Sequence, residues 1–231
     1  GWRTPIFITV MIGVMALTAF LLLYRPAPNP PQKIALEKEG LFSSLLSVEV
    51  LAWLVGFCWM WFNAAVISFS TFAPDFFISK GYSIGFAGFL TSLLMWGSLG
   101  LSPIIGRLVD KVGNNDLFIG AGGIVLATAI YLVIKSTDFL FSMVVMAVAV
   151  AFIPTPVFSL QSKILKTENL GLGFGILSTV SSIGTFFGPY MAGLVRDNTG
   201  SYEMSFIFLS ILAMLVTVTA VALGVKMRRD S

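Results

Sequence analysis

The side chains that could bind a solute are few in this chain, and they lie deep inside long apolar stretches. Asn63 and Gln161 carry amides, which are costly inside a membrane unless they meet a hydrogen-bond partner or water. The candidate solute-contacting residues are Trp59, Asn63, Ser70, Trp96, Gln161 and Ser182. Each of them could instead form a hydrogen bond or an aromatic contact between helices. The sequence leaves both interpretations open.

Catalytic chemistry has little support in this sequence. Residues 81–85 (GYSIG) fit the G-x-S-x-G pattern of serine hydrolases, but such an enzyme needs a base, usually His, and the chain has none. The single Cys58 excludes an internal disulfide and a cysteine-based metal site. We therefore expect no catalytic residue, no metal and no cofactor. A membrane-embedded enzyme is the weakest of the alternatives.

Seven apolar segments must position these residues. They cover residues 4–24, 50–74, 86–109, 117–134, 139–161, 170–195 and 202–225. Each has roughly the ~20 residues that a helix needs to cross the ~30 Å hydrocarbon core. The chain is 57% hydrophobic and 11% charged, where soluble domains average about 25% charged. The sequence predicts an all-α, polytopic membrane protein and excludes a soluble fold.

The distribution of Lys and Arg predicts the topology. One set of alternate loops, with the C-terminus, holds Arg25, Lys33, Lys38, Arg107, Lys111, Lys163, Lys166, Lys226, Arg228 and Arg229. The other set holds only Arg3, Lys80, Lys135 and Arg196. By the positive-inside rule the first set is cytoplasmic, so the C-terminus is expected inside. The net charge of +3 gives no reason to expect a nucleic-acid partner.

The longest loop divides the chain into three parts. Residues 25–32 (RPAPNPPQ) cannot be helical, because proline lacks an amide donor and biases its predecessor toward extended geometry. The apolar residues between 41 and 50 recur on one helix face, which predicts a short interfacial helix. We expect a transmembrane helix at 1–24, a cytoplasmic linker with an interfacial helix at 25–48, and a six-helix bundle at 49–231. Because the chain begins with Gly, we expect it to be part of a longer protein.

Two segments carry signs of special packing. The segment 170–195 is rich in small residues, which allow close contact between membrane helices. Its candidate packing or hinge residues are Gly175, Gly184, Gly188, Pro189 and Gly193, with a kink expected at Pro189. Static packing explains these glycines about as well as motion does. Pro154 and Pro156 should break the helix that precedes Gln161.

Residues 106–113 (GRLVDKVG) lie between two predicted spans and resemble the G-x-x-x-D-[RK]-x-G signature of the major facilitator superfamily. The family pattern continues with two basic residues, whereas here Asn114 and Asn115 follow. The resemblance implies a cytoplasmic gating motif formed by Gly106, Arg107, Asp110, Lys111 and Gly113. It also implies that Asp110 helps to close the cytoplasmic side against a partner in the opposite half.

Residues 1–3 and 188–202 also resemble segments of that family. They imply that the chain corresponds to helix six, the central loop and helices seven to twelve. The likeness to the organic-anion and monocarboxylate branches of the family is weak. The implied function is secondary active transport of a small solute by alternating access between two six-helix halves, in the cell membrane. The expected partners are the solute, an organic anion among the candidates, the lipid bilayer and the N-terminal half. A transporter-like sensor or assembly partner without flux of its own is the remaining alternative.

Overall fold

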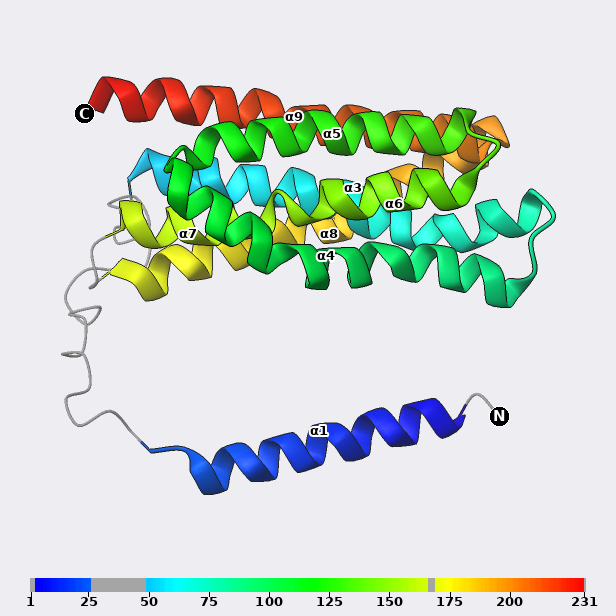
Figure 1. Ribbon diagram of the computed structural model, residues 1–231, viewed down its shortest axis with the longest axis horizontal. Helices are drawn as coiled ribbons and strands as arrows, with labels where there is room; N and C mark the ends of the chain where they lie inside the picture. Colours follow the sequence, from blue (N-terminus) through cyan, green and yellow to red (C-terminus); the bar gives the residue numbers. More distant parts are fainter. Residues whose placement is uncertain (1–2, 26–48, 166–168, 231) are drawn as a thin grey trace. The chain divides into compact units, whose positions relative to one another are not determined.

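The computed structural model describes residues 3–25, 49–165 and 169–230, and every regular element in these ranges is a helix (Figure 1). The chain divides into two compact units, residues 1–41 and 42–231. The predicted proline-rich linker and interfacial helix fall almost entirely in residues 26–48, outside the described ranges.

The first unit contains helix α1 (Arg3–Leu23), which is apolar around its whole circumference. Two of its three threonines, Thr9 and Thr18, donate hydrogen bonds to the carbonyls of Pro5 and Val14 within the same helix, at 2.9 and 2.8 Å. With these two hydroxyls satisfied internally and no charge after Arg3, α1 is suited to the hydrocarbon core of a membrane.

The second unit is a bundle whose helices match the six predicted spans. They are α3 (Val50–Ser79), α4 (Ile84–Val112), α5 (Asn115–Lys135), the pair α6 (Phe139–Ala151) and α7 (Pro154–Ile164), α8 (Leu170–Thr199) and α9 (Tyr202–Asp230). With α1 they make seven membrane-length apolar segments, which confirms the predicted all-α, multi-pass membrane fold. Most of these helices extend a few residues beyond the predicted spans; α8 continues through 196–199 and α9 through 226–230.

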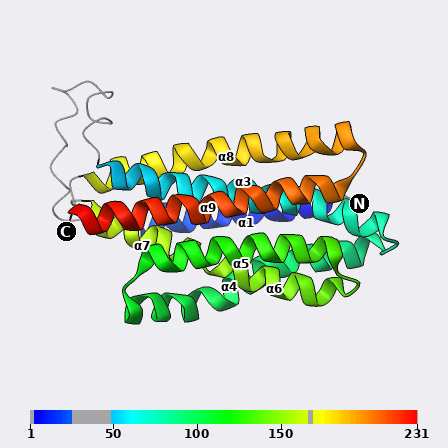
Figure 2. The ribbon, with the colours of Figure 1, turned by 90° about the horizontal axis from the view of Figure 1, so that it is seen from above.

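Helix α3 lies at the centre of the bundle and packs against α8, α9, α4 and α7. α5 packs along α9, and α4 along α6. In Figure 2, α8 and α4 lie on opposite sides of the bundle, with α3 and α7 between them. Close contacts hold these pairs together: Gly97 of α4 faces Ala147 of α6 with no room for a β-carbon. Small residues of this kind replace the hydrophobic drive that membrane helices lack.

The fifth span of the bundle is broken, as the prolines predict. α6 ends at Ala151 and α7 begins at Pro154, with Phe152 and Ile153 forming the joint. Gly122 of α5 lies against this joint, since a β-carbon there would collide with Ile153. The broken helix is thereby packed at its weakest point.

The two ends of the bundle differ in structure. Where α3 ends, an aromatic cluster joins α3, α6 and α9. The ring centroid of Phe76 lies 5.0 Å from that of Phe206 and 5.8 Å from that of Phe139. Nearby, Lys80 and Glu203 form an ion pair at 3.1 Å. At the opposite end α4 stops at Gly113, whose φ of 79° places it in the left-handed region that favours glycine.

Candidate functional site

The candidate site is built on the middle of α3. Asn63 is half-buried, and its Nδ2 donates to the carbonyl of Trp59 in the preceding turn at 2.7 Å. This bond lies within one helix and uses one of the two amide N–H groups, so the amide oxygen and the second N–H are the groups that Asn63 can offer to a solute. Ser70, two turns further on, donates in the same way to the Val66 carbonyl at 2.9 Å.

Aromatic rings from two other helices extend the surface around Trp59. Its ring stacks on Phe62 at 5.0 Å and meets Phe158 of α7 edge to face at 5.1 Å. Phe158, which is 42% exposed, lies parallel to Phe174 of α8 at 6.3 Å. Edge-to-face and offset contacts are the favoured geometries of aromatic pairs. α3, α7 and α8 thus present a continuous aromatic wall beside Asn63.

Gln161 occupies a different environment from Asn63. It is fully buried between α7 and α8, and its Nε2 donates to the Gly173 carbonyl at 2.8 Å. Its Oε1 is buried without a hydrogen-bond partner among the described residues. The sequence placed both amides in one candidate site. In the structure, Gln161 ties α7 to α8 instead of facing an open surface.

The two remaining candidates lie on the outer faces of the flanking helices. Trp96 of α4 is 68% exposed. Ser182 of α8 is also exposed, and its hydroxyl donates to the Ser178 carbonyl at 2.9 Å. The structure therefore brings Trp59 and Asn63 together, while Trp96 and Ser182 lie on separate helices.

The glycines of α8 differ in their surroundings. Gly184 and Gly188 lie directly against the α3 backbone, where a β-carbon would collide with the carbonyls of Met60 and Ala64 respectively. Gly193 has the Phe72 ring nearby, whereas Gly175 is exposed and has open space beside it. α8 continues through Pro189 for ten residues to its end at Thr199, so this proline does not terminate the helix.

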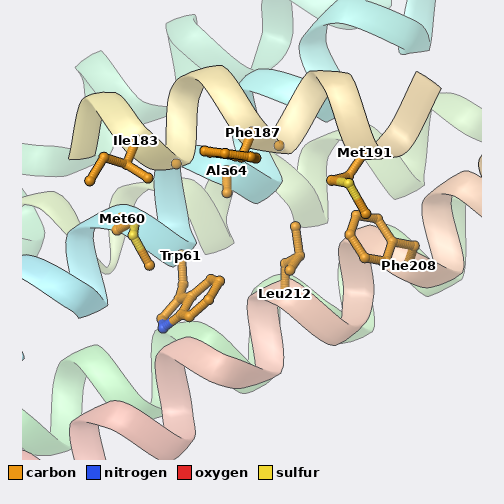
Figure 3. A pocket seen from close by; sticks show the side chains of 10 residues that line it. Met60, Trp61, Ala64, Ile183, Phe187, Met191, Phe208 and Leu212 are labelled. Atoms are coloured by element: carbon orange, nitrogen blue, oxygen red, sulfur yellow. The ribbon is translucent and has the colours of Figure 1, made fainter. Parts of the chain in front are cut away.

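Figure 3 shows an apolar groove beside these glycines. It encloses about 250 Å³, and α3, α8 and α9 line it with residues that include Met60, Trp61, Phe187 and Leu212. These side chains offer almost no polar group that could orient a solute. The groove is therefore a poorer candidate for solute recognition than the surface around Asn63.

The sequence motif at residues 106–113 forms the end of α4 and the turn into α5. Gly106 faces Thr155 of α7, since a β-carbon there would lie 3.5 Å from the threonine methyl group. Arg107, Asp110 and Lys111 are all exposed on the surface of the bundle. The Gly113 amide caps α4 by donating to the Val109 carbonyl at 2.8 Å.

Asn115 is a structural residue whose role the sequence argument missed. It is 3% exposed, and its Nδ2 donates to the carbonyl of Pro156 in the first turn of α7 at 3.1 Å. Sequence reasoning treated it only as a missing positive charge. The sequence does show an amide at the start of one span and a helix broken by proline elsewhere. It does not show that these two features lie next to each other in the fold.

Comparison with known proteins gives consistent results. A family model described as Major Facilitator Superfamily matches residues 68–231. The chain is similar to the lysosomal dipeptide transporter of Gallus gallus (27% identity, 74% of this chain and 39% of that protein). It is also similar to the probable nitrate transporter NarT of Staphylococcus epidermidis (24% identity, 98% and 58%). The chain spans about half the length of these curated relatives.

A solved structure matches the fold. The crystal structure of the E. coli fucose:proton symporter FucP superposes with a TM-score of 0.68 at 17% identity, covering 96% of this chain and 55% of that one. At this level of identity the likeness concerns the fold alone.

Proposed function

This chain belongs to the Major Facilitator Superfamily, and on that premise we propose that it forms one half of a secondary transporter for a small organic solute. In the proposed mechanism the α3–α9 bundle rocks against a second bundle, and a site between the two opens alternately to either side of the membrane. Residues 1–24 form a separate transmembrane helix, 25–48 a linker, and 49–231 the C-terminal bundle.

The exposed small-residue faces of α4 and α8 carry this proposal. These are the two least buried membrane-length helices of the bundle. Gly88 and Gly100 on α4, and Gly171 and Gly175 on α8, have nothing within 4 Å of an added β-carbon. Lipid-facing surfaces do not require such residues, whereas closely approaching helices do. Both faces fit further helices of the same protein.

The solute site proposed here is the α3 surface around Asn63, backed by Trp59 and Phe158. Ser70, Trp96, Gln161 and Ser182 remain weaker candidates. The spans of the bundle carry Asp, Glu, Lys and Arg only near their ends. This wall therefore offers aromatic contact and an amide group but no charge. It suits a solute with an apolar group and hydrogen-bonding groups, such as a dipeptide, better than it suits nitrate.

Uptake by the full-length protein in proteoliposomes tests the proposal. We expect saturable uptake of labelled dipeptides, with nitrate as the contrasting solute. Uptake of nitrate alone would contradict the proposed solute class. A folded protein that moves no solute would contradict the transporter and favour a sensor or assembly partner.

We further propose that the protein resides in the cell membrane with its C-terminus in the cytoplasm, because Lys and Arg accumulate at that end. A reporter that is active only in the cytoplasm, fused after Ser231, should be active and checks the orientation. Activity of a reporter that works only on the opposite side would contradict the proposed orientation.

A further inference from the structure

A groove between α5 and α9 forms a second surface feature of the bundle. The two helices run side by side (Figure 1), and the space between them is about 270 Å³. Most of its lining is apolar, including Ala121, Ile124 and Val221, and Asp116 and Arg228 close one end. Asp116 is in the first turn of α5 and Arg228 in the last turn of α9, so we expect this end of the groove at the membrane boundary.

The floor of the groove is fixed by close helix contact. Thr217 of α9 donates to the Gly120 carbonyl of α5 at 2.9 Å. Gly123 lies against the Thr217 backbone with no room for a β-carbon. The rims are exposed, with Leu117 and Val221 each about 60% accessible. The groove therefore has a closely packed floor and opens outward from the bundle. A surface of this kind on a membrane protein faces lipid acyl chains.

The charged end of the groove has an uneven exposure. The Arg228 guanidinium lies 3.3 Å from the Asp116 carboxylate, but the arginine side chain is 77% exposed and the aspartate 14%. The carboxylate thus lies behind the guanidinium, and a headgroup at this end meets the positive charge. Arg229 and Lys226 add basic charge to the same helix end, and Asp230 offsets one of these charges.

We propose that this groove binds an anionic phospholipid of the phosphatidylglycerol type, with one acyl chain between α5 and α9 and the phosphate on Arg228. Guanidinium groups match phosphate oxygens in geometry and charge. Basic pockets between membrane helices are typical binding sites for acidic headgroups. A headgroup recognised through its amine would need an accessible carboxylate, and Asp116 is the shielded member of the pair.

Lipid retention by the full-length protein tests this site without any measurement of transport. The protein is equilibrated in bilayers with equal amounts of phosphatidylglycerol, phosphatidylethanolamine and phosphatidylcholine, extracted in mild detergent, and its bound lipids are quantified by mass spectrometry. We expect phosphatidylglycerol to be enriched. Arg228→Gln should lower the enrichment about fivefold, the factor expected from losing one basic contact with an acidic lipid. Arg229→Gln is the matched control and should lower it less.

Two further variants separate the chain-binding groove from the headgroup contact. Ala121→Phe fills the groove without changing any charge and should also reduce retention. Asp116→Asn removes the carboxylate and should keep or increase phosphatidylglycerol binding. Thermal unfolding in detergent identifies any misfolded variant. If Arg228→Gln is misfolded, Arg228→Lys replaces it, because lysine keeps the charge, and we expect intermediate retention of phosphatidylglycerol.

Equal retention of phosphatidylglycerol by the wild type and Arg228→Gln would overturn the site. Enrichment of phosphatidylethanolamine that Asp116→Asn abolishes would also overturn it. Crosslinks between cysteines introduced at Ala121 of two copies would assign the groove to self-association instead.

Discussion

Asn63 is the residue on which solute recognition is expected to depend most. One of its amide N–H groups already donates to the Trp59 carbonyl within α3, and this bond fixes the direction of the whole amide group. A side chain fixed in this way accepts a hydrogen bond from a solute at little entropic cost.

Replacing Asn63 with alanine should therefore impair solute binding more than folding. We expect a raised Michaelis constant or loss of uptake, with thermal stability nearly unchanged. Loss of a hydrogen bond within the membrane costs about 0.6 kcal/mol on average. Thr71→Ala is the matched control, because Thr71 makes the same kind of bond to the Ile67 carbonyl on an exposed face of α3. A destabilised Asn63→Ala protein with unchanged solute affinity would remove Asn63 from the site.

Asp110 should influence the balance between inward-open and outward-open states. It is exposed at the end of α4, which leaves it accessible to a partner in another part of the transporter. If that partner is a cation or a helix N-terminus, the interaction is worth about 0.3–1 kcal/mol, or roughly a two- to fivefold change in population. We expect Asp110→Asn to favour inward-open states, and Lys111→Gln to have a smaller effect. Fluorescence distance measurements on the full-length protein check this. An unchanged ratio of inward-open to outward-open states would mean that residues 106–113 act only as a structural turn.

Residue identity alone could not separate Asn63 from Gln161. Both are amides inside apolar spans, and the sequence justified the same expectation for each. Their surroundings differ because Gln161 follows the break between α6 and α7, which turns its side chain toward Gly173 of α8. The direction of a side chain after a helix break depends on the packing of the joint, and local sequence does not contain that information.

At the scale of elements, helix length was the most predictable property. A charge-free stretch of about 20 residues has few alternatives to a membrane helix, so all seven segments were predictable from hydropathy. The break at Pro154 was predictable because proline has no amide hydrogen to donate. The predicted span also ran past Pro189, and α8 continues through that proline as expected, while the kink there stays a prediction. Its neighbours on α3 support this region of the helix.

The contact between α8 and α3 should be sensitive to a single methyl group. A β-carbon at Gly188 would collide with the Ala64 carbonyl and the Ser68 hydroxyl, so Gly188→Ala should destabilise the protein by about 1–3 kcal/mol. Gly193→Ala on the same helix would place its β-carbon 3.5 Å from the Phe72 ring, which is an ordinary contact, and alanine has better helix propensity. Thermal unfolding in detergent compares the two. Equal stability of both variants would contradict the close α3–α8 contact.

At the scale of the whole molecule, the bundle alone should not transport. Its exposed α4 and α8 faces and its one-sided, uncharged solute surface fit only part of an alternating-access device. Residues 1–231 in liposomes should show no saturable uptake, whereas the full-length protein should. Saturable transport by residues 1–231 alone would contradict the proposed division into halves.

The aromatic cluster around Phe76 has a mechanical consequence. It clamps α3, α6 and α9 at the end of the bundle opposite the turn at Gly113. Because the cluster joins helices within one bundle, it restrains their movement relative to one another. We expect α3, α6 and α9 to move together at this end and to separate most easily at the opposite end, where the turn that carries Asp110 lies.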